Sequence, residues 1–460
     1  MKLTFAGGAG TVTGSCYYIE VNKLKLLVDC GMHQGGNEIM LNRVSFPFRP
    51  DEIDYCFVTH AHIDHSGMLP RLAKEGFKGK ILCTSATKDL LPPMLYDSAN
   101  IQAGDAEWLT KKSMRAGGGP VEPVYTLEDV KAALPLIEVK EYGVLCHLGQ
   151  GVKFRFIDAG HILGSAALEV WFQDSEREKK IVFSGDIGKK GNPILRDPST
   201  SDTADYVVME STYGNRNHRP LKESIDELAS AVKAAFKRGG NVYIPSFAVG
   251  RTQDLLYILN NLSREGRLYR ADVYLDSPLA EAVTNIYLNH RECFDDEARR
   301  FFSTRVTESS IRLHFCRTPE DSMSLNRIRS CSIIIAGSGM CEGGRIRHHL
   351  KHNLWRPECS VIFVGYQAEG TLGRAIVGGA KTVNVLGEEV VVRASIHTIN
   401  GFSALAGQSS LLEWLSALDN APKVFLVHGE KKASETFGEL VREKLGLDAC
   451  RPMDGETVEL

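Results

Sequence analysis

The chain has 460 residues, about three times the usual length of one domain, so a single small domain is excluded and two domains are expected. Its hydrophobic share of 43% is that of an ordinary soluble globular protein and excludes a chain that lacks a core. The formal net charge is −3, so the protein as a whole does not attract a polyanion such as a nucleic acid. Such a ligand would have to bind a local patch of basic residues.

The sequence gives no sign of a membrane or secretory protein. No run approaches the ~20 apolar residues needed to span a bilayer, and the start, MKLTFAGGAGTVTGS, contains no long apolar stretch, so we expect no signal peptide. The 11 cysteines are scattered and form no C-x-x-C pair, which argues against a disulfide framework and a thiolate zinc knuckle. We expect Cys30, Cys56 and Cys331 to be small core residues. These features predict a cytoplasmic protein without a membrane partner.

Residues 1–210 show short apolar runs separated by glycine-rich turns, which is typical of a strand-rich segment. A capping box at Thr126–Asp129 predicts a short helix, and residues 117–120 predict a surface loop. The expected strands, of which the first three form a meander, are Leu3–Ala6, Cys16–Val21, Lys25–Asp29, Ile53–Val58, Ile81–Thr84, Val152–Asp158, Ala166–Trp171, Lys180–Phe183 and Tyr206–Glu210.

After residue 210 strands alternate with helices, which indicates βαβ units and a parallel sheet. The expected helices are Ser224–Arg238, Arg251–Asn260, one from about Gly344, Gln408–Leu418 and Ser434–Leu445. The expected strands are Val242–Pro245, Ile333–Ala336, Ser360–Val364, Val390–Ser395 and Lys423–Val427.

Three histidines and an aspartate lie within six residues of the segment THAHIDHSG, residues 59–67, directly after an apolar strand. Neutral imidazole and carboxylate are ligand types of zinc and its neighbours. Residues two apart in an extended segment project to the same side, so His60 and His62 can converge on one ion, and the turn that follows can bring Asp64 and His65 to a second. The density of ligand-type residues argues against a solvated loop with coincidental histidines. A structural zinc site is disfavoured because such sites are usually closed and cysteine-rich.

Further candidate ligands stand after later strands, each with a glycine within a few residues. They are His161, Asp186 and His428. Asp29, in LLVDCG, repeats the pattern and can orient a ligand through a hydrogen bond. Each residue alone would more often be an ordinary surface or core residue, and the shared pattern favours a common site.

The segment THAHIDHSG, together with these later residues, resembles the metallo-β-lactamase superfamily. The resemblance implies an αββα sandwich with two zinc ions at one edge. It also implies two ligand sets bridged by Asp186, namely His60, His62 and His161 for one ion and Asp64, His65 and His428 for the other. Manganese and iron accept the same ligand types, so the identity of the metal stays open.

Motifs after Glu210 resemble the β-CASP branch of nucleases within this superfamily: ESTYGNR, IPSFAVGRTQDLL, DSPLA, AGSGMCEGGRIRHHL, GYQAEGTLGR and INGFSALAG, followed by LVHGE. They occur in order and cover nearly the whole chain. The resemblance implies a metallo-β-lactamase domain made of residues 1–210 and 391–460, with a β-CASP domain of residues 211–390 inserted and built on a parallel sheet. RNA-acting members carry a histidine at the last motif, so His428 favours RNA.

The implied activity is metal-dependent hydrolysis of RNA phosphodiester bonds, as an endonuclease, a 5′ exonuclease or both, by a chain that is a possible homodimer. Asp186 would set the spacing of two ions, and Glu210 would orient a catalytic neighbour. The family places a general-acid histidine where this chain has Leu405, and leucine cannot donate a proton. General acid catalysis is worth ~10²–10⁴ in rate, so we expect weakened hydrolysis. The catalytic candidates are Asp29, Asp64, Asp186, Glu210 and the position of Leu405.

Two other functions stay open. A pseudo-nuclease would keep its metals and bind RNA without turnover, as the leucine at position 405 suggests. A small-molecule hydrolase of the same superfamily, such as a lactonase or thioesterase, is disfavoured because it would need no large inserted domain.

The inserted segment also contains candidate phosphate-binding features. Backbone N–H groups around residues 338–344 precede an expected helix, and basic residues follow from Arg345. A solvated helix face or ion pairs within the domain are the alternatives. The candidate RNA-binding residues are Ser246, Arg251, Ser338, Gly339, Arg345 and Arg374.

Overall fold

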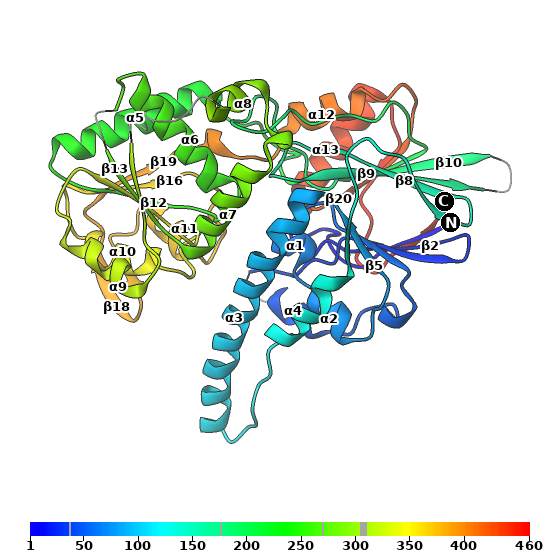
Figure 1. The fold of residues 1–460 in the computed structure, drawn as a ribbon, viewed down its shortest axis with the longest axis horizontal. Helices are drawn as coiled ribbons and strands as arrows, with labels where there is room; N and C mark the ends of the chain where they lie inside the picture. The colour runs from blue at the N-terminus through cyan, green and yellow to red at the C-terminus, as the bar shows by residue number, and fades with distance from the viewer. Residues whose placement is uncertain (36–37, 175–176, 269–270, 304–310) are drawn as a thin grey trace. The chain divides into compact units, whose positions relative to one another are not determined.

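The computed structural model describes residues 1–35, 38–174, 177–268, 271–303 and 311–460 (Figure 1). The chain divides into two compact units. The first unit contains residues 1–190, 196–217 and 405–460, and the second contains residues 191–195 and 218–404. Among the described residues, none of the helices combines the length and the apolar character that crossing a bilayer requires.

Two seven-stranded sheets form the centre of the first unit. One has the strand order β22 (Thr457–Glu459), β1 (Lys2–Phe5), β2 (Tyr17–Val21), β3 (Leu24–Val28), β4 (Tyr55–Phe57), β5 (Lys80–Cys83), β6 (Ile137–Val139). The other has the order β21 (Ala449–Cys450), β20 (Lys423–Val427), β11 (Tyr206–Glu210), β10 (Glu178–Phe183), β9 (Ala166–Gln173), β8 (Val152–Asp158), β7 (Cys146–Gly149). The strands β1, β2 and β3 pair antiparallel, as the predicted meander requires.

The two sheets pack against each other through their alternating apolar residues. Phe5 of one sheet lies 5.4 Å from Phe425 of the other, and Phe57 lies 4.9 Å from Phe154, measured between ring centroids. All four side chains are at most 1% exposed. Burial of each such ring stabilises the fold by roughly 1.5–3 kcal/mol, so the sheet-to-sheet contact is the main core of this unit.

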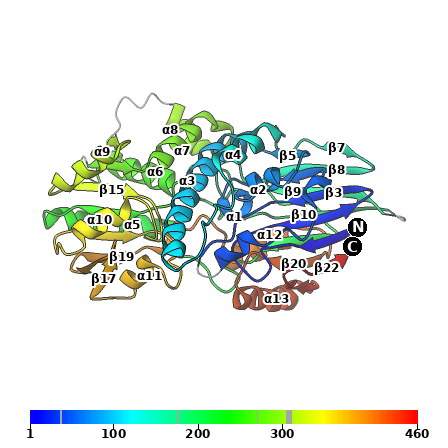
Figure 2. The same cartoon turned by 90° about the horizontal axis from the view of Figure 1, so that it is seen from below.

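Helices cover the outer faces of the sandwich (Figures 1 and 2). On one side they are α1 (Ile63–Ser66), α2 (Leu69–Lys74), α3 (Ser85–Arg115) and α4 (Leu127–Ala133), and on the other α12 (Gln408–Ser416) and α13 (Lys431–Leu445). Phe437 and Val441 of α13 pack with Val207 and Leu426 of the sheet. The predicted capping box opens α4, where Thr126 and Asp129 bond each other's backbone amides. The αββα architecture is therefore confirmed.

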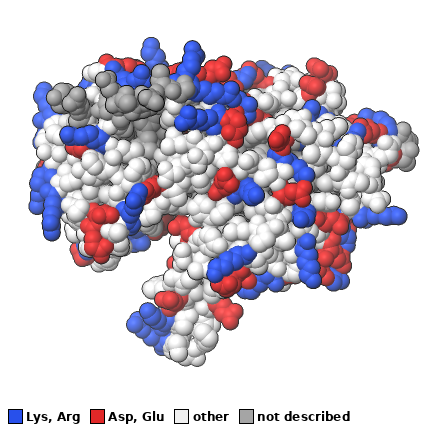
Figure 3. Space-filling view, viewed as in Figure 1, with Lys and Arg blue, Asp and Glu red and all other residues white. Residues whose placement is uncertain are grey.

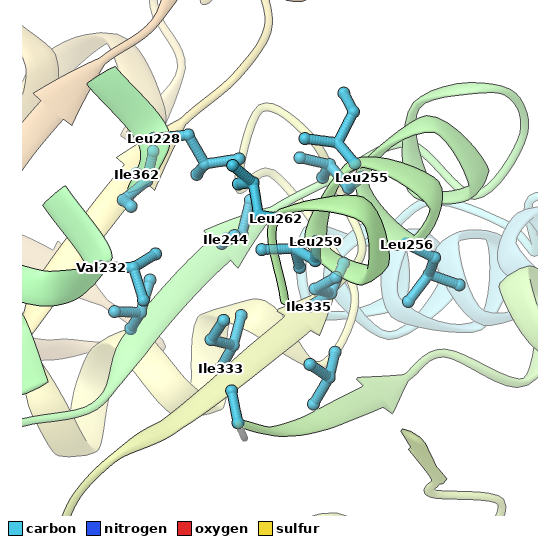
Figure 4. Packing of buried hydrophobic residues seen from close by; sticks show 14 of the residues in the cluster. Leu228, Val232, Ile244, Leu255, Leu256, Leu259, Leu262, Ile333, Ile335 and Ile362 are labelled. Atoms are coloured by element: carbon cyan, nitrogen blue, oxygen red, sulfur yellow. The ribbon is translucent and has the colours of Figure 1, made fainter. Parts of the chain in front are cut away.

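The second unit is built on a six-stranded sheet with all neighbouring strands parallel, which confirms the predicted parallel sheet. Its order is β14 (Arg312–Phe315), β13 (Asp272–Asp276), β15 (Ser332–Ala336), β12 (Val242–Pro245), β16 (Ser360–Phe363), β19 (Ser395–Thr398), with a separate hairpin of β17 (Thr382–Val385) and β18 (Glu388–Val391). The helices are α5 (Leu221–Lys237), α6 (Arg251–Arg264), α7 (Pro278–Asn289), α8 (Asp296–Ser303), α9 (Pro319–Ser324), α10 (Ile346–Asn353) and α11 (Leu372–Val377). Leucines of α5 and α6 pack on isoleucines of β12, β15 and β16 (Figure 4).

Two expectations about local structure are wrong. The expected strand Val390–Ser395 is interrupted, because the amides of Arg393 and Ala394 both bond the carbonyl of Leu354 instead of a strand partner. Cys331 is exposed rather than a core residue, whereas Cys30 and Cys56 are buried. The sequence also gave no expectation of the 31-residue helix α3.

Candidate metal centre

The candidate ligands meet at one edge of the sandwich because they follow strands that end there. β10, β11 and β20 run parallel, so Asp186, Glu210 and His428 lie at neighbouring strand ends. His161 follows β8, which runs in the same direction because β9 pairs antiparallel with both β8 and β10. The carboxyl ends of parallel strands are the usual place for a ligand site in such sheets.

The segment after β4 supplies four candidate ligands in two local conformations. His60 and His62 lie in the non-helical stretch between β4 and α1, with His62 at φ −59° and ψ 146°. Helix α1 begins immediately afterwards and carries Asp64 and His65, so the expected turn is a short helix. The Ser66 hydroxyl donates to the carbonyl of His62 at 3.0 Å and fixes this change of direction.

The first ligand set consists of His60, His62, His161 and Asp186. His60 Nε2 lies 3.1 Å from His62 Nδ1, which lies 3.3 Å from His161 Nε2. Asp186 Oδ2 lies 3.5 Å from His161 Nε2 and 3.8 Å from His60 Nε2. Three nitrogens and one oxygen therefore converge from three separate segments.

The second set consists of Asp64, His65 and His428. His65 Nε2 and His428 Nε2 are 3.3 Å apart, and His428 Nε2 lies 3.5 Å from Asp64 Oδ2. The other oxygen of Asp186, Oδ1, lies 3.3 Å from His65 Nε2. The carboxylate of Asp186 thus faces both sets, one oxygen toward each.

These contacts fit metal ions better than hydrogen bonds. Three mutually close imidazole nitrogens cannot all be satisfied by protons shared among them, because each proton joins only one pair. A tetrahedral zinc ion with bonds of about 2.0–2.1 Å separates its ligand atoms by about 3.3–3.4 Å, close to the separations within each set. The Oδ1 atom of Asp186 is also buried and has no hydrogen-bond donor among the described residues. The donors present therefore suit zinc and similar cations.

Neighbouring groups contact Nδ1 of three of the histidines, His60, His65 and His428, and leave Nε2 of these rings for a metal ion. Asp29 accepts a hydrogen bond from Nδ1 of His65 at 2.7 Å. Thr59 Oγ1 donates to Asp29 at 2.8 Å and lies 3.1 Å from Nδ1 of His60, from which it can accept. Thr212 Oγ1 donates to the carbonyl of His428 at 2.9 Å and lies 3.1 Å from Nδ1 of that ring. A hydrogen bond at Nδ1 is the usual way to hold a metal-binding imidazole in one tautomer.

The sequence analysis missed Thr59 and Thr212 as functional residues. Each lies inside a motif that was singled out, since Thr59 is the first residue of THAHIDHSG and Thr212 is the third residue of ESTYGNR. A hydroxyl next to a ligand was the available signal. The role of such a hydroxyl depends on which ring nitrogen it contacts, and the sequence does not contain that information.

Burial and charge divide the histidines into two groups. Burial lowers the pKa of His60 well below its usual value and that of His161 to about 3, so both are neutral donors near pH 7. Burial also acts on His65, but the charges of Asp186 and Asp29 prevail and raise its pKa well above the usual value. Burial would raise the pKa of Asp186, yet His428 and His65 hold it well below its usual range. A metal ion held by the second set would have to displace the proton that this raised pKa favours on His65.

Glu210 and Leu405 both border Asp186. Glu210 accepts hydrogen bonds from the amides of Ile187 and Thr212, each at 3.1 Å, and so fixes the backbone next to Asp186. Burial, followed by the charge of Asp186, raises the pKa of Glu210 to about 8. Leu405 pairs with Gly188, two residues beyond Asp186, and is partly exposed. Its side chain offers no proton to the site.

Three of the candidate RNA-binding residues lie on adjoining loops after β12 and β15, where the amide of Ser246 bonds the carbonyl of Ala336, two residues before Ser338 and three before Gly339. Arg345 donates to the buried Asp276 at 2.7 Å and to the carbonyls of Cys316 and Arg317, which accounts for its position without RNA. Arg251 is largely buried, 3.8 Å from Asp254.

The remaining candidates differ in exposure. Ser246 is buried and accepts from Thr252 at 3.0 Å. The Ser338 amide bonds the carbonyl of Gly343, and the carbonyl of Gly339 accepts from Gln367. Arg374 is exposed on α11. Arg374 therefore has the most freedom to meet a ligand.

Comparison with known proteins assigns the chain to a family. Residues 9–246 match the metallo-β-lactamase superfamily, and residues 252–376 match the β-CASP domain. Residues 389–452 match the zinc-dependent metallo-hydrolase RNA specificity domain. The chain belongs to the β-CASP branch of the metallo-β-lactamase superfamily.

Relatives of this β-CASP protein match it over nearly its whole length. A ribonuclease from Thermus thermophilus is 39% identical, covering 96% of both chains. An RNase J-like protein from Methanocaldococcus jannaschii is 31% identical over 98% of both chains. A transcription termination factor, FttA, from Methanosarcina mazei is 31% identical over 100% of this chain and 72% of its own. A solved structure of a protein of unknown function from Enterococcus faecalis shares the fold, with a TM-score of 0.58 at 12% identity, covering 100% of this chain and 99% of that one.

Proposed function

We propose that this β-CASP protein is a metal-dependent ribonuclease that hydrolyses RNA phosphodiester bonds at the centre around Asp186. The observation that carries the proposal is the convergence of two ligand sets on the two oxygens of Asp186. The match of residues 389–452 to an RNA specificity domain and the ribonuclease from Thermus thermophilus support RNA as the substrate.

We further propose that the centre holds two zinc ions, with manganese or iron as alternatives to be separated by elemental analysis. Bound ions of this class supply Lewis acidity that lowers the pKa of water and polarises the phosphate. The chain's own residues prepare the site. Asp29 and Thr59 orient His65 and His60, and Glu210 fixes the backbone beside Asp186. Asp186 holds the two ligand sets at a constant separation. A phosphate group of the substrate would contact the metal ions held by both sets.

Cleavage of 5′-labelled RNA tests the proposal directly. We expect products with the metal-loaded protein, none after a chelator has removed the metal, and recovery when zinc or manganese is returned. Asp186→Asn should abolish cleavage, whereas Asp419→Asn, at an exposed position of the same unit, should leave it unchanged. Label released as mononucleotide would indicate a 5′ exonuclease, and internal fragments an endonuclease. A rate that is insensitive to the chelator and to Asp186→Asn would refute the proposal.

A second candidate, an RNA-binding pseudo-nuclease, is favoured by one observation. Leu405 occupies a backbone position fixed beside Gly188, where the family carries a proton-donating histidine. We expect Leu405→His to raise the cleavage rate by about 10²–10⁴-fold, the usual worth of general acid catalysis. Leu405→Gln, which is polar but does not titrate, should give no such gain. Equal rates for both variants would remove Leu405 as the cause of weak hydrolysis.

Three broader predictions go with this function. We propose a catalytic domain of residues 1–210 and 391–460 with a β-CASP domain of residues 211–390, which limited proteolysis can test. We propose a cytoplasmic location, which the 11 free cysteines support because reducing compartments keep thiols free. A homodimer stays a prediction that sedimentation analysis would decide.

A further inference from the structure

Helix α3 extends far beyond the sheet that it packs on (Figure 1). Its 31 residues correspond to about 46 Å at ~1.5 Å per residue. Its beginning is hydrogen-bonded to the loop after β8, because the hydroxyls of Thr84 and Thr87 donate to the carbonyl of Gly164 at 2.7 and 2.9 Å. Gly164 lies three residues after the candidate ligand His161. We call residues 98–125, the outer part of α3 with the segment that returns from it, the arm.

The arm is held together along its inner side. Thr110 Oγ1 accepts from the amide of Val121 at 2.9 Å and donates to its carbonyl at 3.2 Å. The Tyr125 hydroxyl donates to Ser98 at 2.8 Å, and Tyr125 and Ala106 are at most 5% exposed. The returning segment therefore packs on the inner face of α3 and forms hydrogen bonds with it. The outer face of α3 stays exposed, with its side chains on a helix that is held in place.

The outer face of the arm combines an exposed indole with positive charge. Trp108 is 62% exposed and Ile101 is 58% exposed. Lys112 Nζ lies 5.4 Å from the centroid of the Trp108 ring. Spacings of seven and four residues place Ile101, Trp108, Lys112 and Arg115 on one side of the helix.

The end of the helix carries three cations. Lys111, Lys112 and Arg115 are exposed, and none forms an ion pair with any residue that the structure describes. Acidic residues precede these cations on the helix, with Glu107 four residues before Lys111 and Asp105 seven residues before Lys112. Lys and Arg side chains are visible at the far end of the arm in Figure 3. The charge of the last turn is therefore free to meet an anion.

We propose that the arm is a second RNA-binding site, which holds a single-stranded part of the substrate away from the bond that is cut. An exposed aromatic ring beside unpaired cations is the combination that binds single strands, because a base stacks on the ring while the cations neutralise phosphates. Bulk charge of −3 does not provide this attraction, so a local group of cations is required. The inference rests on the proposed ribonuclease function.

The position of the arm predicts a dependence on RNA length. Trp108 lies 24 residues beyond Thr84, which is about 36 Å along the helix. A stacked strand covers this span with about 11 nucleotides at ~3.4 Å each. RNA of about 5 nucleotides can reach the metal centre but not the arm at the same time, whereas RNA of about 25 nucleotides can reach both.

Two arm variants and two matched controls test the proposal. Trp108→Ala removes the stacking ring, and the triple variant Lys111→Gln, Lys112→Gln, Arg115→Gln removes the charge. The controls are Trp355→Ala, an exposed tryptophan elsewhere in the chain, and Lys233→Gln with Lys237→Gln, two exposed lysines one helical turn apart. Thermal melting checks that every variant is folded. Binding is measured by fluorescence anisotropy with a 25-nucleotide RNA, each variant being combined with Asp186→Asn so that the RNA is not cut, and cleavage is measured with 5- and 25-nucleotide RNA in the presence of the native Asp186.

We expect Trp108→Ala to weaken binding of the long RNA about tenfold, the usual loss when one stacking ring is removed. The triple variant should lower the slope of log affinity against log salt by about 2, since each phosphate contact with a single strand contributes about 0.7. For cleavage, KM for the long RNA should rise while kcat and all constants for the short RNA stay unchanged.

Three outcomes would overturn the proposal. The first is an unchanged affinity for long RNA in both arm variants, and the second is an equal loss in the control variants. The third is a change in oligomeric state with Trp108→Ala by sedimentation, which would make the arm a protein-docking surface. If the wild type cuts neither RNA, the ribonuclease proposal fails, and the anisotropy measurement still decides whether the arm binds RNA.

Discussion

Replacing Asp29 with asparagine tests how the protein prepares its ligands. Asp29 is 0% exposed and accepts three hydrogen bonds, from the amide and hydroxyl of Thr59, each at 2.8 Å, and from His65 Nδ1 at 2.7 Å. Asparagine has almost the same volume but only one acceptor oxygen, and its amide hydrogens would face donors. The substitution therefore removes the negative charge and at least one of the three bonds without opening a cavity.

The structure sets the size of the expected effect. Loss of a hydrogen-bond partner behind a metal ligand typically costs about 10–100-fold in metal affinity. An unsatisfied buried donor costs about 1–3 kcal/mol in the free energy of unfolding. Since Asp29 contacts His65 directly and His60 only through Thr59, one of the two proposed ions should lose affinity much more than the other.

The effect should grow as the pH rises. In the metal-free protein Asp186 and Asp29 raise the pKa of His65 well above its usual value against the effect of burial, so a proton competes with the metal for this ring. Asparagine at position 29 should lower the pKa of His65, so at low pH a proton competes less strongly with the metal for this ring. This gain in metal affinity partly offsets the affinity lost because His65 is no longer held in position. Above the pKa of His65 no such offset remains, and the full loss of affinity should appear.

Zinc titration against a fluorescent chelator at several pH values, combined with thermal melting, measures both quantities. Asp419→Asn, at an exposed position, serves as the matched control. The reasoning is refuted if Asp29→Asn binds zinc at every site within a factor of two of the wild type at every pH and melts at the same temperature.

Three further predictions concern stability. Removal of the metal by a chelator should lower the melting temperature by several degrees, because ions present at about 1,000 times their dissociation constant stabilise the fold by about 4 kcal/mol, and an unchanged melting curve would contradict a metal-filled centre. Burial raises the pKa of Asp254 to about 7, so the folded protein favours the neutral carboxyl. The free energy of unfolding should therefore fall as the pH rises from about 4 to 7, by about 4 kcal/mol in total. Asp254→Asn should remove this fall in urea unfolding, and the same pH dependence in the variant and the wild type would refute the prediction. Phe57→Ala should destabilise the first unit by about 3–5 kcal/mol in the same assay, since Phe57 is fully buried against Phe154, and a loss below about 1 kcal/mol would contradict the packing described for the sandwich.

Much of the architecture could be predicted because local patterns and the tertiary fold agree. Val152–Asp158 alternates apolar and polar residues and forms the predicted strand with the same bounds. The capping box at Thr126 opens a helix as expected. The metal-ligand prediction was accessible for the same reason, because His60, His62, Asp64 and His65 lie together in the sequence and the other candidates follow apolar strands.

Helix α3 could not be predicted in this way. Its sequence contains Pro92 and Pro93, which normally end a helix, and Gly104, and its outer half exposes Ile101 and Trp108 instead of showing one apolar face. Its inner face is satisfied by a returning segment whose contacts, such as Thr110 with Val121, exist only after folding. Periodicity reports an apolar face, and this helix has no continuous one.

The sequence by itself determined the types of chemistry available to this protein: the imidazoles and carboxylates, their order along the chain, and the absence of a donor at Leu405. Only the tertiary structure decided which atoms meet. In the folded protein the two oxygens of Asp186 face different candidate ligand sets. Arg345 donates a hydrogen bond to Asp276, 69 residues earlier in the chain, and does not lie in an open phosphate site. The physical reason is that direction and distance between remote side chains are set by strand pairing and packing, which depend on the whole chain at once.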